Sequence, residues 1–157
     1  RAVPLPEAPL DRFFGRLSVG YPSLDDELRI LAAQAQKHPI DLLQPVISEA
    51  EVLAAREAVK AVHVSPAVAR YAASITAATR SNADLLGAST RGTLALVRGA
   101  QGLAYLRGRE FVSPDLVKAM AEPVLAHRLI VRPQATAMGQ TARAILASIM
   151  EQVLPPV

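Results

Sequence analysis

A short stretch, Gly87-Ala88-Ser89-Thr90-Arg91, brings together residue types that can bind an anion. It joins a glycine, two hydroxyls that can cap a helix and an arginine directly before a segment rich in Ala and Leu. A helix begins with free N–H groups and the positive end of its dipole. An arginine in the first turn adds to that positive potential, and a bound anion would explain its presence. The stretch therefore predicts a phosphate-binding helix start.

Other kinds of site find less support in the sequence. His38, His63 and His127 lie far apart and lack metal-ligand spacing, so no metal site is expected. No serine stands in a Gly-x-Ser-x-Gly elbow, which argues against serine hydrolase chemistry. The acidic run at 25–27 could bind a metal, but the first turn of a helix favours negative charge and explains the run better.

Composition limits the class of protein. The 157 residues are 51% hydrophobic and 20% charged, which indicates a folded globular chain. There is no Cys, which excludes disulfides and fits a reducing cytoplasm. The net charge is +3, but the arginines are spread along the chain near carboxylates or helix ends, which argues against a nucleic-acid surface. The chain opens at Arg1 without Met, and we expect neither a signal peptide nor a membrane span, and a cytoplasmic location.

Capping residues and apolar spacing predict a mainly α protein. Ser-Pro pairs, a Ser-x-x-Glu capping box and Gly108 mark helix ends. The expected helices span about 23–37, 48–59, 65–80, 89–107, 113–120 and 141–153. Short extended pieces are expected at 16–19, 62–64, 110–112 and 129–131, and 62–64 could pair with 110–112, whereas 81–87 reads as a loop. The prediction is a helical bundle with one or two very short β pairings.

The first 22 residues differ from the rest of the chain. Pro4, Pro6 and Pro9 give a loop-like entry, and 10–14 could form a helical turn before the expected strand at 16–19. A single short strand makes no sheet, so this segment is expected to be the end of another domain.

The order of these pieces resembles the C-terminal part of the MoxR family of AAA+ ATPases. The pieces are Leu5-Pro-Glu-Ala8, Leu10-Asp-Arg-Phe13, Gly20-Tyr-Pro22, Gly87-Ala-Ser-Thr-Arg91, Val112-Ser-Pro-Asp-Leu-Val117 and Val124-Leu-Ala-His-Arg-Leu129. The resemblance covers about residues 5–132. It implies that residues 1–22 are a remnant of the α/β ATPase core, with the arginine-finger segment and last strand, and that 23–157 form the helical lid domain.

The resemblance also implies roles for particular residues. Arg91 would be the sensor-2 arginine that contacts the γ-phosphate of ATP, with Ser89 or Thr90 capping the helix and Gly87 permitting a tight approach. The family often has proline at the position of Thr90. Arg12 would be the arginine finger that reaches the ATP of a neighbouring subunit, although a surface ion pair with Asp11, worth at most ~1 kcal/mol, is the alternative.

Further implied roles concern a hinge and a structural pair. Gly20, Tyr21 and Pro22 would form the hinge between core and lid. Arg16 competes with Arg12 as the finger but is less well placed. For His127-Arg128 the preferred interpretation is a structural pair that satisfies backbone carbonyls near a helix end.

An intact family member would bind ATP and Mg²⁺, assemble into a homo-oligomeric ring, by analogy a hexamer, and remodel client proteins, among them proteins with von Willebrand A domains. Walker A and Walker B motifs are absent from this sequence, so the isolated chain is expected to be inactive, with no bound cofactor and with its missing ATPase core as a partner. Two other interpretations stay open: a non-enzymatic helical interaction module and a basic helical nucleic-acid-binding domain.

Overall fold

The computed structural model describes residues 10–34 and 38–156, and its contacts divide the chain into two units. Residues 17–56 form one unit, and residues up to Arg16 join Glu57–Val157 in the other, the helical unit. The motif at residues 5–8 and the prolines at 4, 6 and 9 lie outside the described residues. The domain division expected after residue 22 stays a prediction.

The unit of residues 17–56 contains exposed helices. Helix α2 spans Leu24–Ala33, the 3-10 helix η1 spans Pro39–Leu42, and α3, at Glu49–Ala61, begins here and ends in the helical unit. Ser23 caps α2, because its hydroxyl accepts from the Asp26 N–H at 3.2 Å. None of these three helices contains a buried residue, so the described residues of this unit show no hydrophobic core.

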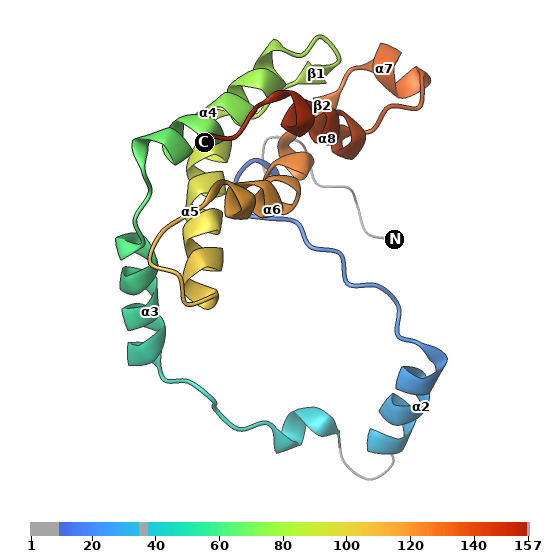
Figure 1. Cartoon of the computed structure of the whole chain (residues 1–157). Helices are drawn as coiled ribbons and strands as arrows, with labels where there is room; N and C mark the ends of the chain where they lie inside the picture. Colours follow the sequence, from blue (N-terminus) through green and yellow to red (C-terminus); the bar gives the residue numbers. More distant parts are fainter. Residues whose placement is uncertain (1–9, 35–37, 157) are drawn as a thin grey trace. The chain divides into compact units, whose positions relative to one another are not determined.

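The helical unit is built on four longer helices that pack together (Figure 1). They are α4 (Pro66–Ser81), α5 (Thr90–Leu106), α6 (Pro114–Leu125) and α8 (Ala142–Gln152). Ile75, Leu96, Leu116 and Leu146 are fully buried between them. Several alanines are buried as well, and their small side chains let the helix backbones approach closely: Ala72, Ala100, Ala104 and Ala121.

Two small β contacts join the loops of this unit. Strand β1 (Leu85–Leu86) pairs antiparallel with β2 (Ile130–Val131), in a register that places Leu85 opposite Val131. A parallel bridge joins His63 to Phe111. The expected mainly α fold with very short pairings is confirmed, as is the pairing of 62–64 with 110–112. The loop expected at 81–87 is corrected, because two of its residues pair with a segment more than 40 positions away.

Three other details differ from the expectation. Residues 16–19 form no strand, because no strand in the described part of the chain pairs with them, although the Arg16 N–H donates to the Pro123 carbonyl at 2.8 Å. Helix α6 continues through Pro123 to Leu125. A short helix α7 (Pro133–Ala137) and the 3-10 helix η2 (Ala126–Arg128) complete the unit. Across residues 10–34 and 38–156, every helix is too short or too polar to cross a membrane.

Candidate functional site

The start of α5 carries an arginine in its first turn. Ser89 stands at the N-cap with extended backbone, so Arg91 falls in the first turn, which contains no acidic residue. Ser89 makes no side-chain capping bond to the helix. The side-chain cap expected from the Ser89 hydroxyl is therefore not formed, and this hydroxyl is available to another partner.

Gly87 sets the approach of this helix start to α4. A Cβ atom at Gly87 would lie 2.5 Å from backbone atoms of Thr79 and Arg80, so no other residue fits without movement. The next residue, Ala88, donates its N–H to the Thr79 hydroxyl at 3.1 Å, and its carbonyl accepts from Arg80 at 3.0 Å. Gly87 thus permits a close approach to the last turn of α4, whereas its expected role beside a nucleotide stays a prediction.

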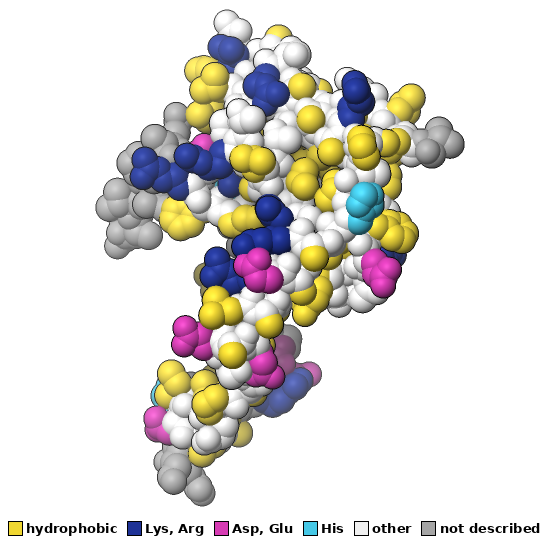
Figure 2. All heavy atoms as spheres, turned by 90° about the vertical axis from the view of Figure 1, so that its left-hand side faces the viewer, with side chains coloured by type: hydrophobic (Ala, Val, Ile, Leu, Met, Phe, Trp, Pro, Cys, Tyr) yellow, Lys and Arg dark blue, Asp and Glu magenta, His cyan; other side chains and the backbone are white. Residues whose placement is uncertain are grey.

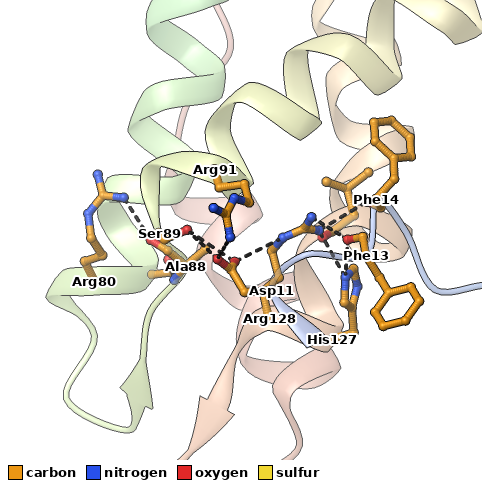
Figure 3. Close-up of polar contacts among 11 residues, drawn as sticks. Asp11, Phe13, Phe14, Arg80, Ala88, Ser89, Arg91, His127 and Arg128 are labelled. Atoms are coloured by element: carbon orange, nitrogen blue, oxygen red, sulfur yellow. Dashed lines mark hydrogen bonds and ion pairs between the residues drawn. The ribbon is translucent and has the colours of Figure 1, made fainter. Parts of the chain in front are cut away.

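Asp11 lies at the centre of the site (Figure 3). The Ser89 hydroxyl donates to its two carboxylate oxygens at 3.2 and 3.1 Å. Arg91 Nη1 lies 3.3 Å from Oδ2, and Arg128 Nε lies 3.4 Å from Oδ1. One carboxylate thus meets two guanidinium groups and a hydroxyl at the positive end of a helix. Two positive charges face one negative charge, which leaves a surplus suited to an anion.

Arg128 anchors the segment that carries Asp11. Its side chain is only 2% exposed and donates to the carbonyls of Phe13, Phe14 and Val124. His127 Nε2 donates to the Phe13 carbonyl at 3.1 Å. These contacts confirm the structural-pair interpretation. Burial lowers the pKa of the Arg128 guanidinium, while the Asp11 charge acts in the opposite direction. Burial likewise lowers the pKa of the His127 imidazole.

Arg91 differs from Arg128 in its surroundings. Its side chain is 58% exposed, and its ion pair with Asp11 is its one such contact within the described part of the chain. The partner of Arg91 in this chain is an internal carboxylate, that of Asp11. Arg91 remains accessible to a larger anion from solvent.

The other residues singled out from the sequence lie apart from this cluster. Arg12 follows Asp11 directly, is exposed, and forms no hydrogen bond or ion pair with residues 10–34 or 38–156. Gly20, Tyr21 and Pro22 are exposed within the unit of residues 17–56. The finger role of Arg12 and the hinge role of these three residues stay predictions.

The described residues offer little to a metal ion or to a nucleic acid. The described residues include no cluster of three or more His, Cys, Asp or Glu side chains able to hold a metal ion. On the face drawn in Figure 2, Lys and Arg side chains stand in several separate groups, some beside acidic side chains. A continuous basic stripe of the kind that follows a nucleic-acid backbone is not seen on that face.

Asp11 is a candidate that the sequence alone does not reveal. It belongs to the Leu10-Asp-Arg-Phe13 motif, whose sequence alone suggests only a pair with the adjacent Arg12. Its real partners, Ser89 and Arg91, lie about 80 positions further along the chain. One signal in the sequence points to it: Asp11 is the one acidic residue of its motif, and Arg91 in the motif at 87–91 has no acidic residue beside it.

Comparison with known proteins identifies the helical unit. Residues 77–149 match the AAA lid domain. The chain is 39% identical to the uncharacterized protein YeaC of Bacillus subtilis over 98% of its length and 48% of the relative. It is 30% identical to the chaperone MoxR1 of Mycobacterium tuberculosis over 98% of its length and 43% of the relative. It is 32% identical to the protein MoxR of Paracoccus denitrificans over 82% of its length and 44% of the relative.

A solved structure agrees with these relatives. The crystal structure of a "putative ATPase" from Cytophaga hutchinsonii superposes with a TM-score of 0.87 at 28% identity, over 99% of this chain and 50% of the other. The chain spans about half of the length of the curated relatives it matches. The lid-domain match, the relatives and the shared fold together show that the chain belongs to the MoxR-type AAA+ ATPases and corresponds to their C-terminal part, which carries the lid domain.

Proposed function

We propose that this chain is the nucleotide-sensing lid of a MoxR-type ATPase, in which Arg91 contacts the γ-phosphate of ATP bound between the lid and an ATPase core. One observation carries the proposal: Arg91 is a half-exposed arginine in the first turn of α5, where Asp11 is its ion-pair partner among the described residues. The free helix N–H groups and the guanidinium favour the same charge.

A phosphate can replace the Asp11 carboxylate as the partner of Arg91 at little energetic cost. An ion pair between exposed or half-exposed side chains is worth about 0–1 kcal/mol. A guanidinium can bind a phosphate group with two parallel hydrogen bonds, and a phosphate brings more charge than a carboxylate. The Asp11–Arg91 pair, with Arg91 58% exposed, is therefore a weak competitor for a well-placed γ-phosphate.

The residues present fit the phosphate end of a nucleotide and leave the rest of its site to the ATPase core. Arg91 would hold the γ-phosphate, and Mg²⁺ would neutralise phosphate charge during transfer. No Walker A sequence occurs in this chain, and no cluster of ligands for a metal exists among residues 10–34 and 38–156. The chain alone is therefore expected to hydrolyse no ATP.

Arg12 is proposed as the arginine finger of a ring in which each subunit completes the site of its neighbour. Support comes from its exposure and from the anchoring of the adjacent Asp11 to Ser89, Arg91 and Arg128. An arginine finger needs a side chain that extends toward the neighbouring subunit and a backbone that is fixed to its own subunit. Such an arginine accelerates phosphoryl transfer by roughly 10³–10⁵-fold.

Lid movement would couple hydrolysis to work on other proteins. Gly20, Tyr21 and Pro22 would absorb the rotation between core and lid, within a cytoplasmic hexameric ring. The proposed work is chaperone-like remodelling of client proteins, including proteins with von Willebrand A domains. The MoxR1 relative bears the name of a chaperone, which supports this class of activity.

The test of Arg91 is its replacement by alanine in the intact ATPase. Arg91→Ala should lower ATP turnover at least tenfold without changing the unfolding temperature by more than about 2 °C, since the side chain is largely exposed. Arg107→Ala removes an arginine from the opposite end of α5 and should stay within twofold of the parent. Turnover of Arg91→Ala within twofold of the parent would refute the sensor role and favour a helical module that contacts partners without a nucleotide role.

Mixed rings test Arg12. Arg12→Ala subunits keep their own ATP site, whereas subunits with a disabled Walker A lysine keep their finger. Mixing the two inactive proteins should restore part of the turnover, because some intact sites then face an intact finger. Absence of recovery at every mixing ratio would contradict action on a neighbouring subunit.

A further inference from the structure

We infer that Asp11 is a positioning residue that stands in for a nucleotide phosphate at Arg91 and links the occupancy of Arg91 to the placement of Arg12. This inference rests on the proposed function, and it adds a residue that the sequence motifs do not assign. It is based on the position of the Asp11 carboxylate between the exposed Arg91 and the buried Arg128 (Figure 3).

The Asp11 carboxylate occupies the kind of position that a phosphate takes. Each of its oxygens accepts from the Ser89 hydroxyl, at 3.2 and 3.1 Å. Oδ2 faces Arg91 at 3.3 Å, and Oδ1 faces Arg128 at 3.4 Å. A hydroxyl, two guanidinium groups and a helix start converge on phosphate oxygens in many nucleotide sites. A γ-phosphate at Arg91 must therefore compete with this carboxylate.

The two arginines respond differently to such competition. Arg128 is 2% exposed and is held by the carbonyls of Phe13, Phe14 and Val124, so it cannot follow a ligand. Arg91 is 58% exposed, and Asp11 is its ion-pair partner in the described part of the chain. When a phosphate takes Arg91, Asp11 keeps Arg128 and loses its contact with Arg91 on α5. The Asp11 carboxylate, which paired with both arginines, then pairs with Arg128 alone.

This change reaches Arg12 through one peptide unit. Consecutive Cα atoms are about 3.8 Å apart, so a rotation of the backbone at Asp11 also moves the adjacent Arg12. Arg12 has no hydrogen-bond or ion-pair partner of its own in residues 10–34 and 38–156 to oppose that movement. The bridged and single-paired states of Asp11 therefore present Arg12 differently, and nucleotide at Arg91 selects between them.

The test separates nucleotide affinity from turnover in the intact ATPase. Asp11→Asn retains the shape of the side chain and removes its charge. We expect a non-hydrolysable ATP analogue with Mg²⁺ to bind about two- to fivefold more tightly, because an exposed ion pair of ordinary strength no longer competes. The kcat should fall at least threefold, because Arg12 loses its attachment. Asp11→Glu keeps the charge and should show an affinity within twofold of the parent.

Two further variants identify the cause of any change. Asp84→Asn removes an exposed carboxylate elsewhere in the helical unit and should alter neither quantity. The gain in affinity from Asp11→Asn should vanish in an Arg91→Ala background. A gain that persists there would mean general charge repulsion and would overturn the inference.

The remaining outcomes are equally distinct. Weaker or unchanged analogue binding by Asp11→Asn, with kcat reduced, would show a merely structural role and would also overturn the inference. If Arg91→Ala alone leaves turnover unchanged, the proposed function fails. If Arg91→Ala lowers turnover but Asp11→Asn does not tighten binding, the inference about Asp11 fails by itself.

Discussion

Replacing Gly87 by alanine should destabilise the helical unit more than any exposed substitution near the site. The new Cβ would lie 2.5 Å from Thr79 carbon and oxygen and from Arg80 nitrogen, whereas ordinary contact begins near 3.4 Å, so the segments must separate by about 0.9 Å. All three atoms are backbone atoms of α4 and cannot rotate away. Overpacking of this kind costs about 1–3 kcal/mol.

A neighbouring hydrogen bond adds to the cost of Gly87→Ala. Ala88 donates to the Thr79 hydroxyl at 3.1 Å, and separation of the two segments stretches this bond, worth about 1 kcal/mol. The expected loss of unfolding free energy is therefore about 3 kcal/mol. For a unit of about 100 residues this lowers the midpoint of thermal unfolding by more than about 10 °C.

Thermal and urea unfolding of the 157-residue chain, followed by circular dichroism, would measure this loss. Gly102→Ala is the matched control, because a Cβ there meets no atom within 4 Å and the residue lies inside α5. Alanine is the better helix former, so this control should gain about 0.5–1 kcal/mol. If Gly87→Ala loses less than about 1 kcal/mol, the close approach to α4 is not what fixes the helix start.

Three further predictions concern the same helical unit. Leu96→Ala, at a fully buried position of α5, should cost about 2–5 kcal/mol in urea unfolding, and a loss below 1 kcal/mol would contradict the described core. Ser65→Ala removes the acceptor of the Val68 N–H and should cost about 1 kcal/mol, whereas Ser74→Ala on the exposed face of α4 should cost nothing. Burial lowers the pKa of His127 below 6.5, so the unfolded chain binds more protons just below that pH and stability should fall as the pH is lowered through this range. His127→Gln should flatten this dependence in thermal unfolding scans from pH 7.5 to 5, and an unchanged slope would assign it to other groups.

The helices were predictable because their ends are chemically marked. Ser65 followed by Pro66 begins α4, and the Ser48–Glu51 capping box begins α3, with both of its backbone bonds present. These signals act within three or four residues, so a sequence displays them directly. The general fold class followed from them.

Features that depend on distant partners were harder to predict. The two residues of β1 are too few to show an alternating pattern, and their pairing with β2 depends on how the helices bring the loops together. Residues 16–19 have the composition of a strand but no partner strand, so composition alone misled. Helix α7, five residues long, falls below the length at which apolar spacing is informative.

The candidate site was predicted in part for the same reason. The motif at 87–91 located the start of α5, whereas the roles of Gly87 and Arg91 at a nucleotide stay predictions. The contact of Ser89 with Asp11 was missed, because the capping preference of serine suggests a local bond and a carboxylate about 80 positions earlier in the chain outcompetes it.

The attachment of the segment that carries Asp11 and Arg12 uses mainly main-chain atoms of that segment. Arg128 and His127 bind the carbonyls of Phe13 and Phe14, and the Arg16 N–H binds the Pro123 carbonyl. Every residue type offers the same carbonyl, and every type except proline offers the same N–H. Sequence drift at 13, 14 and 16 therefore leaves these bonds intact. The side chains of this segment can therefore change during evolution without loss of the attachment, whereas a change of Arg128 would remove its hydrogen bonds.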